Sequence, residues 1–120
     1  MTTHTLKLET NDFVQVYSGE KEYGLRLYDQ ETQLYQDNDI IIVEERDSGS
    51  FFTATLTRVQ YFMYFDQVFQ AYDYKKFAPT AISVEDAIQM YERIPEYSEK
   101  ARELGLLVFK INKISGVACF

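Results

Sequence analysis

Five segments of the chain have the residue pattern of β-strands, and they limit the possible fold more than any other feature. Apolar residues alternate with polar ones in "HTLKLE" and in "EYGLRLY", which places the apolar side chains on one face of a strand. The β-branched "DNDIIIVEE", the long "FFTATLTRVQYF" and the closing "LLVFKINKI" complete the set. The turn residues "RDSGS" predict a hairpin between the third and fourth of these strands.

Helical signals lie between the predicted strands. In "TNDFVQVYSG" we expect a helix capped by Thr10, Asn11 or Asp12 and stopped by Gly19. The segment "YFDQVFQAYDYKKF" has apolar residues at i, i+3, i+4 and i+7, as an amphipathic helix does. In "SVEDAIQMYERI" Ser83 is the expected N-cap, and "EYSEKAREL" predicts a last short helix that ends at Gly105.

The resulting element order is β-α-β-β-β-α-α-α-β, mostly joined by antiparallel hairpins. This order predicts an α+β domain with a small curled β-barrel of mostly antiparallel strands and flanking helices. No repeat or linker divides the 120 residues, so residues 1–120 are expected to form a single domain. Residues 114–120, which include "SGVACF", are the expected tail.

The charge balance limits the possible partners. With 19 acidic and 12 basic residues the net charge is −7, which argues against duplex DNA, since binding to a phosphate backbone needs a broad basic surface. A small basic cleft remains possible if folding gathers the cations Lys21, Arg26, Arg58, Lys75 and Lys76.

The remaining composition predicts no cofactor and no metal. A single cysteine and a single histidine exclude an internal disulfide and a zinc site built from several cysteines. The N-terminal residues lack the apolar core of a signal peptide, and no apolar run reaches 18 residues. We therefore expect a cytoplasmic protein with no membrane partner.

The stretch "YSGEKEYGLRLYD" holds the strongest candidates for a site. Lys21 follows the predicted helix stop, and Arg26 lies on the polar face of the next strand, together with Glu22 and Gly24. An arginine and a lysine that converge can bind a carboxylate or phosphate, the arginine through two parallel N–H groups. The alternative is a pair of solvated cations that balance Glu20 and Glu22, and the pattern leaves both interpretations open.

A belt of aromatic residues between Tyr61 and Phe77 is a second candidate. Aromatic faces can stack on nucleobases, although packing in the core is the commoner use. Tyr64, Tyr74 and Phe77 lie off the apolar stripe of the predicted helix, and Lys75 and Lys76 adjoin them. No role is assigned to the other polar candidates, which are Glu44, Glu45, Asp47, His4 and Cys119.

Several of these segments together resemble ASCH domains, which are small PUA-like proteins. The resemblance rests on "HTLKL", "VYSGEKEYGLRLYD", "DNDIIIVEE", "YFDQVF", "SVEDAIQMYERI" and "YSEKARELGLLVFKI", and it runs from His4 to Ile114. It implies a β-barrel whose signature G-x-K-x-x-E-x-R lines a cleft for RNA or a nucleotide-like ligand. Gly19, Lys21 and Arg26 match this signature, while Gly24 departs from it. Asp39 matches the aspartate of the family's Gly-Asp turn.

The departure at Gly24 bears on catalysis. The acetylcytidine amidohydrolases, which resemble this fold, have a threonine nucleophile at that position, and glycine offers neither an acid nor a hydroxyl. The resemblance therefore implies a non-catalytic ASCH-type binding module for RNA or a nucleoside or nucleotide. Lys21 and Arg26 would bind a phosphate or base edge beside Glu22, Tyr28 or Tyr74 would stack, and Gly24 would leave extra room.

Two other functions remain open. The chain could be an amidohydrolase for a small N-acylated nucleoside, with Lys21 as base or oxyanion partner and Thr55 or Thr57 in place of the missing nucleophile. It could also be a protein-interaction domain with a degenerate site, in which Glu22 holds Lys21 in an ion pair. The ligand and the oligomeric state are not determined by the sequence.

Overall fold

The structure, a computed structural model, describes residues 2–114. Its elements in chain order are β1 (Thr3–Leu8), α1 (Thr10–Ser18), β2 (Tyr23–Leu27), η1 (Thr32–Leu34), β3 (Ile40–Glu45), β4 (Phe51–Phe62), α2 (Phe65–Ala71), η2 (Tyr74–Lys76), α3 (Val84–Glu92), α4 (Tyr97–Leu104) and β5 (Leu106–Lys113), where η marks a single 3₁₀ turn. This order confirms the predicted β-α-β-β-β-α-α-α-β sequence of elements and the α+β fold class.

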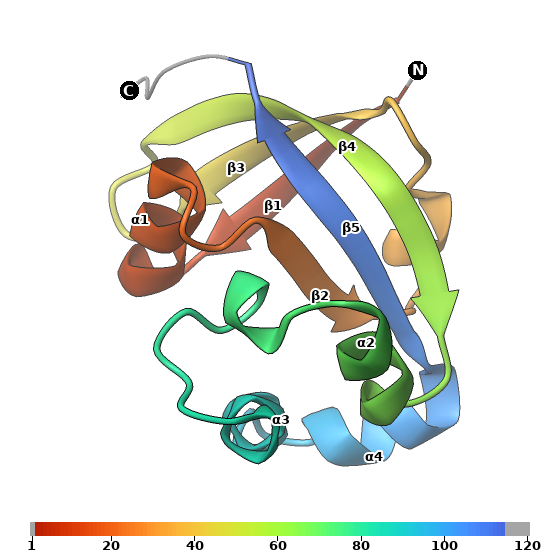
Figure 1. Ribbon diagram of the computed structural model, residues 1–120. Coiled ribbons are helices and arrows are strands. Elements are labelled where there is room, and N and C mark those ends of the chain that lie inside the picture. The colour runs from red at the N-terminus through yellow and green to blue at the C-terminus, as the bar shows by residue number, and fades with distance from the viewer. Residues whose placement is uncertain (1, 115–120) are drawn as a thin grey trace.

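The strands form one curled half-barrel sheet with the order β1-β3-β4-β5-β2 (Figure 1). Only β1 and β3 run parallel among the described strands, and the other neighbours are antiparallel. A register shift between Thr57 and Gln60 bends the long strand β4, and Arg58 at this bulge has a left-handed φ of 53°. The two edge strands of the sheet, β1 and β2, are not joined by a ladder within residues 2–114.

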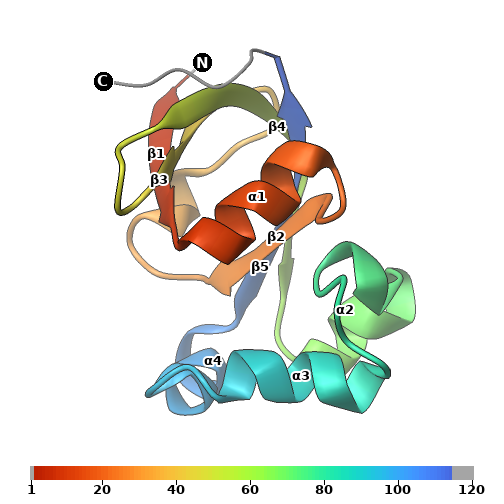
Figure 2. The ribbon, with the colours of Figure 1, turned by 90° about the vertical axis from the view of Figure 1, so that its left-hand side faces the viewer.

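The helices cover one side and one end of the half-barrel. Figure 2 shows α1 lying across the sheet beside β2, while α2, α3 and α4 gather below the end of β2 and β5. Gly19 ends α1 with a φ of 88°, as predicted, because a residue without a Cβ adopts this conformation at low cost. The predicted N-cap of α1 is wrong: the chain turns one residue earlier, and extended Glu9 is the cap.

Two hydrophobic cores hold these layers together. The first lies inside the curl of the sheet, where Phe52, Leu56 and Phe109 pack against Phe13 and Val16 of α1. The second lies between the outer face of β2 and β5 and helices α2 to α4, and it contains Val68, Phe77, Tyr91, Tyr97 and Leu106 among others. Phe77 was expected to lie off the apolar stripe of its helix and so outside the core. This expectation is wrong, because Phe77 is only 1% exposed.

The predicted hairpin and cap signals are confirmed elsewhere. Strands β3 and β4 pair as an antiparallel hairpin. Ser83 caps α3, with its Oγ accepting a hydrogen bond of 3.0 Å from the backbone N–H of Asp86. Within residues 2–114 no helix combines the length and apolarity needed to cross a membrane. The segment "SGVACF", with Cys119, lies outside the described residues.

Candidate functional site

A cleft opens where the half-barrel fails to close, between the edge strands β1 and β2. Its volume is about 480 Å³, within the range of small-molecule sites. Strand β1 supplies Leu6, Lys7 and Leu8, and β2 supplies Gly24, Leu25, Arg26 and Leu27. The remaining lining residues come from α1, the loops, the helical layer and β5: Glu9, Asp12, Val16, Lys21, Asp29, Arg46, Tyr91, Ile94, Tyr97, Phe109 and Ile111.

Strand β2 turns part of its backbone toward this cleft. The C=O of Glu22 accepts from the N–H of Ile111, and the N–H of Tyr28 donates to Gly105. The even-numbered residues of β2 thus direct their backbone N–H and C=O groups toward β5. Because these directions alternate along an antiparallel ladder, the backbone groups of Leu25 point away from β5, toward the open edge. The C=O of Leu25 accepts a bond of 3.5 Å from the Tyr97 hydroxyl. The N–H of Leu25 points to the same side.

Strand β1 does the same on the opposite edge. The C=O of Thr2 accepts from the N–H of Ile40, and the C=O of Leu8 accepts from Arg46. Even-numbered residues of β1 therefore face β3, and the backbone N–H and C=O of Lys7 face the open edge. Since Lys7 also lines the cleft, both sides of the seam offer backbone donors and acceptors as well as side chains.

Lys21 lies within the cleft wall just after the stop of α1. Its side chain is 15% exposed, and its Nζ is 3.7 Å from a carboxylate oxygen of Asp12. The same Nζ lies 5.9 Å from the centre of the Tyr91 ring. Burial lowers the pKa of Lys21, nearby Arg26 lowers it further, and Asp12 opposes both effects. Lys21 is therefore a cation in an environment that favours an additional negative charge.

Arg26 lies half-buried in the same cleft, on β2. Within residues 2–114 its guanidinium has no hydrogen bond and no ion pair, although it can donate five. It lies near enough to Lys21 for its charge to lower the pKa of that lysine. The structure thus brings Lys21 and Arg26 to one cleft, and of these two cations Arg26 is the one without a partner among residues 2–114.

The cleft is more cationic than the whole chain. Its lining contains four cations, Lys7, Lys21, Arg26 and Arg46, and three anions, Glu9, Asp12 and Asp29. The chain as a whole carries a net charge of −7. At the rim, Arg46 forms an ion pair with Glu9 in which both side chains are largely exposed. Inside, Asp29 accepts bonds from the backbone N–H groups of Glu31 and Thr32, which hold its carboxylate in a turn. With the Arg46–Glu9 pair set aside, the lining has three cations and two anions, an excess of one positive charge that favours an anion.

The space over Gly24 is filled, which corrects the expectation of extra room at this position. A Cβ built on Gly24 would lie under 3.0 Å from Cε2 and Cζ of the Phe109 ring. Gly24 pairs with Phe109 across the two strands, and the ring also contacts Tyr35 at 5.4 Å between centroids. Glycine at this position thus makes room for an aromatic ring of the core.

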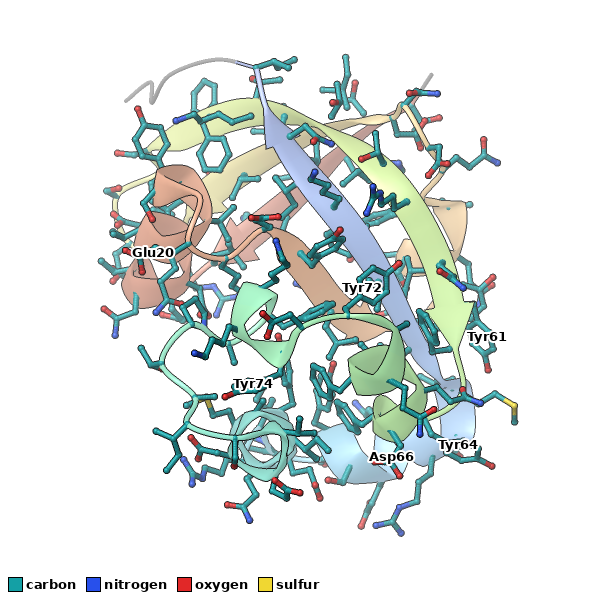
Figure 3. The ribbon with its side chains drawn as sticks, viewed as in Figure 1. Glu20, Tyr61, Tyr64, Asp66, Tyr72 and Tyr74 are labelled. Carbon is teal, nitrogen blue, oxygen red and sulfur yellow. The ribbon has the colours of Figure 1, made fainter. Side chains whose placement is uncertain are left out.

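Three other predicted site residues lie away from the cleft lining. Both carboxylate oxygens of Glu22 accept bonds of 3.1 Å from Lys76 Nζ, so Glu22 pairs with that lysine and Lys21 with Asp12. Tyr28 packs edge-on against Tyr61, with ring centroids 4.8 Å apart. Tyr74 packs against a small cluster of alanines, Ala78, Ala81 and Ala87. In Figure 3, Tyr61 lies toward the end of β4 and Tyr74 beside the helical layer.

Sequence reasoning missed two aromatic walls of the cleft. Neither Tyr91 of α3 nor Tyr97 of α4 was singled out as a site residue. Their ring centroids lie 5.9 Å apart, and burial raises the pKa of both hydroxyls. The hydroxyl of Tyr91 donates to the C=O of Phe77 at 3.3 Å. Only the tertiary fold places Tyr91 beside Lys21, so no local pattern could have found it.

The residues given no role also have defined positions. His4 Nε2 lies 2.8 Å from the carboxylate of Asp39, which also accepts from the backbone N–H groups of Thr2 and Gln36. The hydrogen bond from His4 and the two backbone bonds hold the pKa of Asp39 below its usual value, although burial acts in the opposite direction. This buried pair fixes the start of β1 against β3. Within the described residues no group of three potential ligands could hold a metal ion.

The fold and the cleft define an α+β half-barrel protein with a cationic ligand-sized opening at its seam. Residues 3–75 match the family described as "Domain of unknown function (DUF3850)". The match covers more than half of the chain, so this protein belongs to the DUF3850 family. No curated protein matches the sequence.

Two solved structures share the fold. The hypothetical protein PH0355 has a TM-score of 0.80 and 19% identity, with 95% of this chain and 100% of that chain covered. Protein PF0455 from Pyrococcus furiosus has a TM-score of 0.73 and 17% identity, with 97% of this chain and 100% of that chain covered. At these identities the similarity establishes the half-barrel fold alone.

Proposed function

We propose that this protein is an ASCH-type, PUA-like binding module whose cleft takes RNA or a nucleotide-like ligand without catalysis. The observation that carries the proposal is the half-buried guanidinium of Arg26, which has no partner within residues 2–114 and lies beside Lys21 in a ligand-sized cleft. Loss of hydration without a compensating hydrogen bond is unfavourable for a polar group, and more so for a charge. A bound anion would remove this cost.

A phosphate is the anion that fits these groups best. Arg26 offers a planar pair of N–H donors, which match phosphate geometry, and Lys21 adds a point charge against the ring of Tyr91. The pKa of Lys21 is lowered chiefly by burial, so a negative ligand would stabilise its protonated form. Each of the two cations is thus suited to a phosphate group.

The rest of the cleft suits the neutral part of a nucleotide. Tyr91 and Tyr97 form an apolar wall, and the backbone groups of Leu25 and Lys7 at the seam offer donors and acceptors to the edge of a base. Small-molecule sites commonly combine an apolar lining with a few such polar groups. Tyr91 and Tyr97 therefore replace Tyr28 and Tyr74 as the aromatic contacts of the proposed site.

The composition of the cleft supports binding over hydrolysis. None of the described lining residues is a serine, threonine or cysteine. Of the two threonines considered as substitutes, neither Thr55 nor Thr57 lines the cleft, and the Thr57 hydroxyl accepts a bond of 2.8 Å from Asn112. The ring of Phe109 fills the space that a side chain at Gly24 would need. A nucleophilic hydroxyl would have to come from outside these residues.

Isothermal titration calorimetry at low salt tests the proposal. The four nucleoside 5′-monophosphates, their nucleosides and inorganic phosphate are titrated into the wild type, Arg26→Ala and Lys76→Ala. Arg26→Ala should weaken nucleotide binding about tenfold or more, since hydrogen bonds to charged groups contribute about 1.5–3 kcal/mol. Lys76→Ala, which removes the same charge outside the cleft, should change the affinity less than about twofold. Absence of binding at millimolar ligand, or equal effects of the two substitutions, would contradict the proposal.

A further inference from the structure

A second hollow adjoins the cleft on the far side of Lys21. It lies between α1, the segment 77–80 and α3, and its volume is about 700 Å³. Asp12, Lys21, Tyr91 and Ile94 line both openings, so the two hollows meet at the Lys21–Asp12 pair. Neither the sequence pattern nor the proposed phosphate site accounts for this second opening.

The second hollow differs from the first in charge. Apart from Asp12 and Lys21 at the junction, its described lining residues are all uncharged, among them Asn11, Val14, Gln15, Thr80 and Ile94. Val14 and Ile94 are 56% and 47% exposed, so the opening presents apolar surface to the solvent. Asn11, Gln15 and Thr80 add side-chain donors and acceptors. The lining suits a group with apolar faces and a polar, uncharged edge.

We propose that the second hollow is a subsite for the next nucleoside of a single-stranded oligonucleotide, with Lys21 at the linking phosphate. This inference rests on the proposed function and extends it: the ligand is a strand of at least two nucleotides. Arg26 holds the phosphate of the first unit in the cleft, and the base and sugar of the second unit lie between α1 and the segment 77–80. A nucleobase has the apolar faces and polar edge that this lining matches.

The position of Lys21 fits a linking phosphate. Its Nζ lies 3.7 Å from Asp12, longer than a direct N–H···O hydrogen bond, so its ammonium protons remain available to an oxygen between the hollows. The ring of Tyr91 lies beside it and lines both openings. A single strand can bend at this point with one phosphate near each cation, whereas a free mononucleotide leaves the uncharged hollow empty.

Comparison of mononucleotides with dinucleotides tests the inference. The four nucleoside 5′-monophosphates and the dinucleotides pApA, pCpC, pGpG and pUpU are titrated into the same protein by calorimetry. A second base in contact with the lining should tighten binding at least about fivefold for one or more dinucleotides, the lower end of what a stacked base contributes. Inorganic phosphate and pyrophosphate serve as probes for the phosphate groups alone.

Val14 provides a matched pair of variants. It lines only the second hollow and is exposed, so substitution there leaves the core intact. Val14→Glu places a negative charge beside the expected second unit, and we expect it to weaken dinucleotide binding at least fivefold at low salt. The glutamine of Val14→Gln has nearly the same shape as glutamate without its charge, so this variant should change dinucleotide affinity less than twofold. Both variants should bind mononucleotides as the wild type does.

The outcomes separate this inference from the proposed function. If every dinucleotide binds no tighter than its mononucleotide, or if Val14→Glu weakens both alike, the second subsite is refuted while the proposed function stands. If neither mononucleotides nor dinucleotides bind, both proposals fail. Tighter dinucleotide binding that Val14→Glu selectively reduces supports the two-nucleotide site.

Discussion

Replacing Gly24 by alanine tests the packing that closes the floor of the cleft. The new Cβ would lie under 3.0 Å from two atoms of the Phe109 ring, and Phe109 is fully buried against Tyr35. Overpacking of a core typically costs about 1–3 kcal/mol. Removing a glycine from a strand contributes roughly 0.5–1 kcal/mol in the opposite direction. The net expectation is a loss of about 1–2 kcal/mol in the free energy of unfolding.

Thermal and urea denaturation measure this loss. For a domain of this length, 1 kcal/mol corresponds to roughly 3–6 °C in Tm, so Gly24→Ala should melt about 5–10 °C below the wild type. The double variant Gly24→Ala/Phe109→Leu removes the ring atoms that the Cβ meets, so alanine should cost nothing in that background. The resulting coupling energy should be about 1–2 kcal/mol.

The sign of the single substitution decides the matter. If Gly24→Ala leaves the free energy of unfolding unchanged or raises it, the ring does not occupy the space over Gly24. Gly24 would then provide open room for a ligand, as the sequence alone suggested.

Three further predictions concern the site and its support. Arg26→Lys keeps the charge but loses the paired donors, so calorimetry should show nucleotide binding weakened about fivefold, less than in Arg26→Ala. Undiminished affinity in Arg26→Lys would mean that the planar donor geometry of arginine does not contribute to binding. The bonds that lower the pKa of Asp39 stabilise the fold at pH values above the ordinary pKa of 3.8, and this stabilisation is lost as the pH falls through the lowered pKa. Thermal melts should therefore show Asp39→Asn less stable than the wild type at pH 7, with a smaller difference at pH 3. A stability difference that widens in acid would refute this. Ser83→Ala removes the cap of α3 and should lower the free energy of unfolding by about 1 kcal/mol in urea melts, whereas Ser83→Asp should preserve it; equal losses in both variants would contradict the capping role.

The fold followed from local patterns that the structure confirms. Period-two alternation located the strands, and Gly19, Ser83 and Gly105 marked the helix boundaries at which the chain turns. Those signals act within a few residues of one another, so one sequence carries them in full. The N-cap of α1 was misplaced because Thr10, Asn11 and Asp12 are all favourable cap residues, whereas the cap is Glu9, which is extended and makes no side-chain cap hydrogen bond.

The site followed only in part, because its members come from distant segments. Lys21 and Arg26 lie on either side of a strand start, a pattern that left convergence and solvated cations both open, and the structure places the two residues at one opening. The ion-pair partner of Lys21 is Asp12. Glu22 instead pairs with Lys76, which lies 54 residues further along the chain. Similarly, the ring over Gly24 belongs to the last strand. No local pattern encodes such cross-strand or helix-to-strand neighbours.

The free guanidinium of Arg26 can be observed directly by NMR of the side-chain Nε–Hε groups in ¹⁵N-labelled protein. Nucleoside 5′-monophosphates are added at low salt, and Arg26→Lys identifies the resonance. Binding through paired phosphate contacts should shift the Arg26 signal and slow its exchange with water, while the Arg58 signal, whose guanidinium already donates to Tyr23 at 3.0 Å, should stay unchanged. An Arg26 signal that does not move at millimolar nucleotide would contradict the proposed binding site.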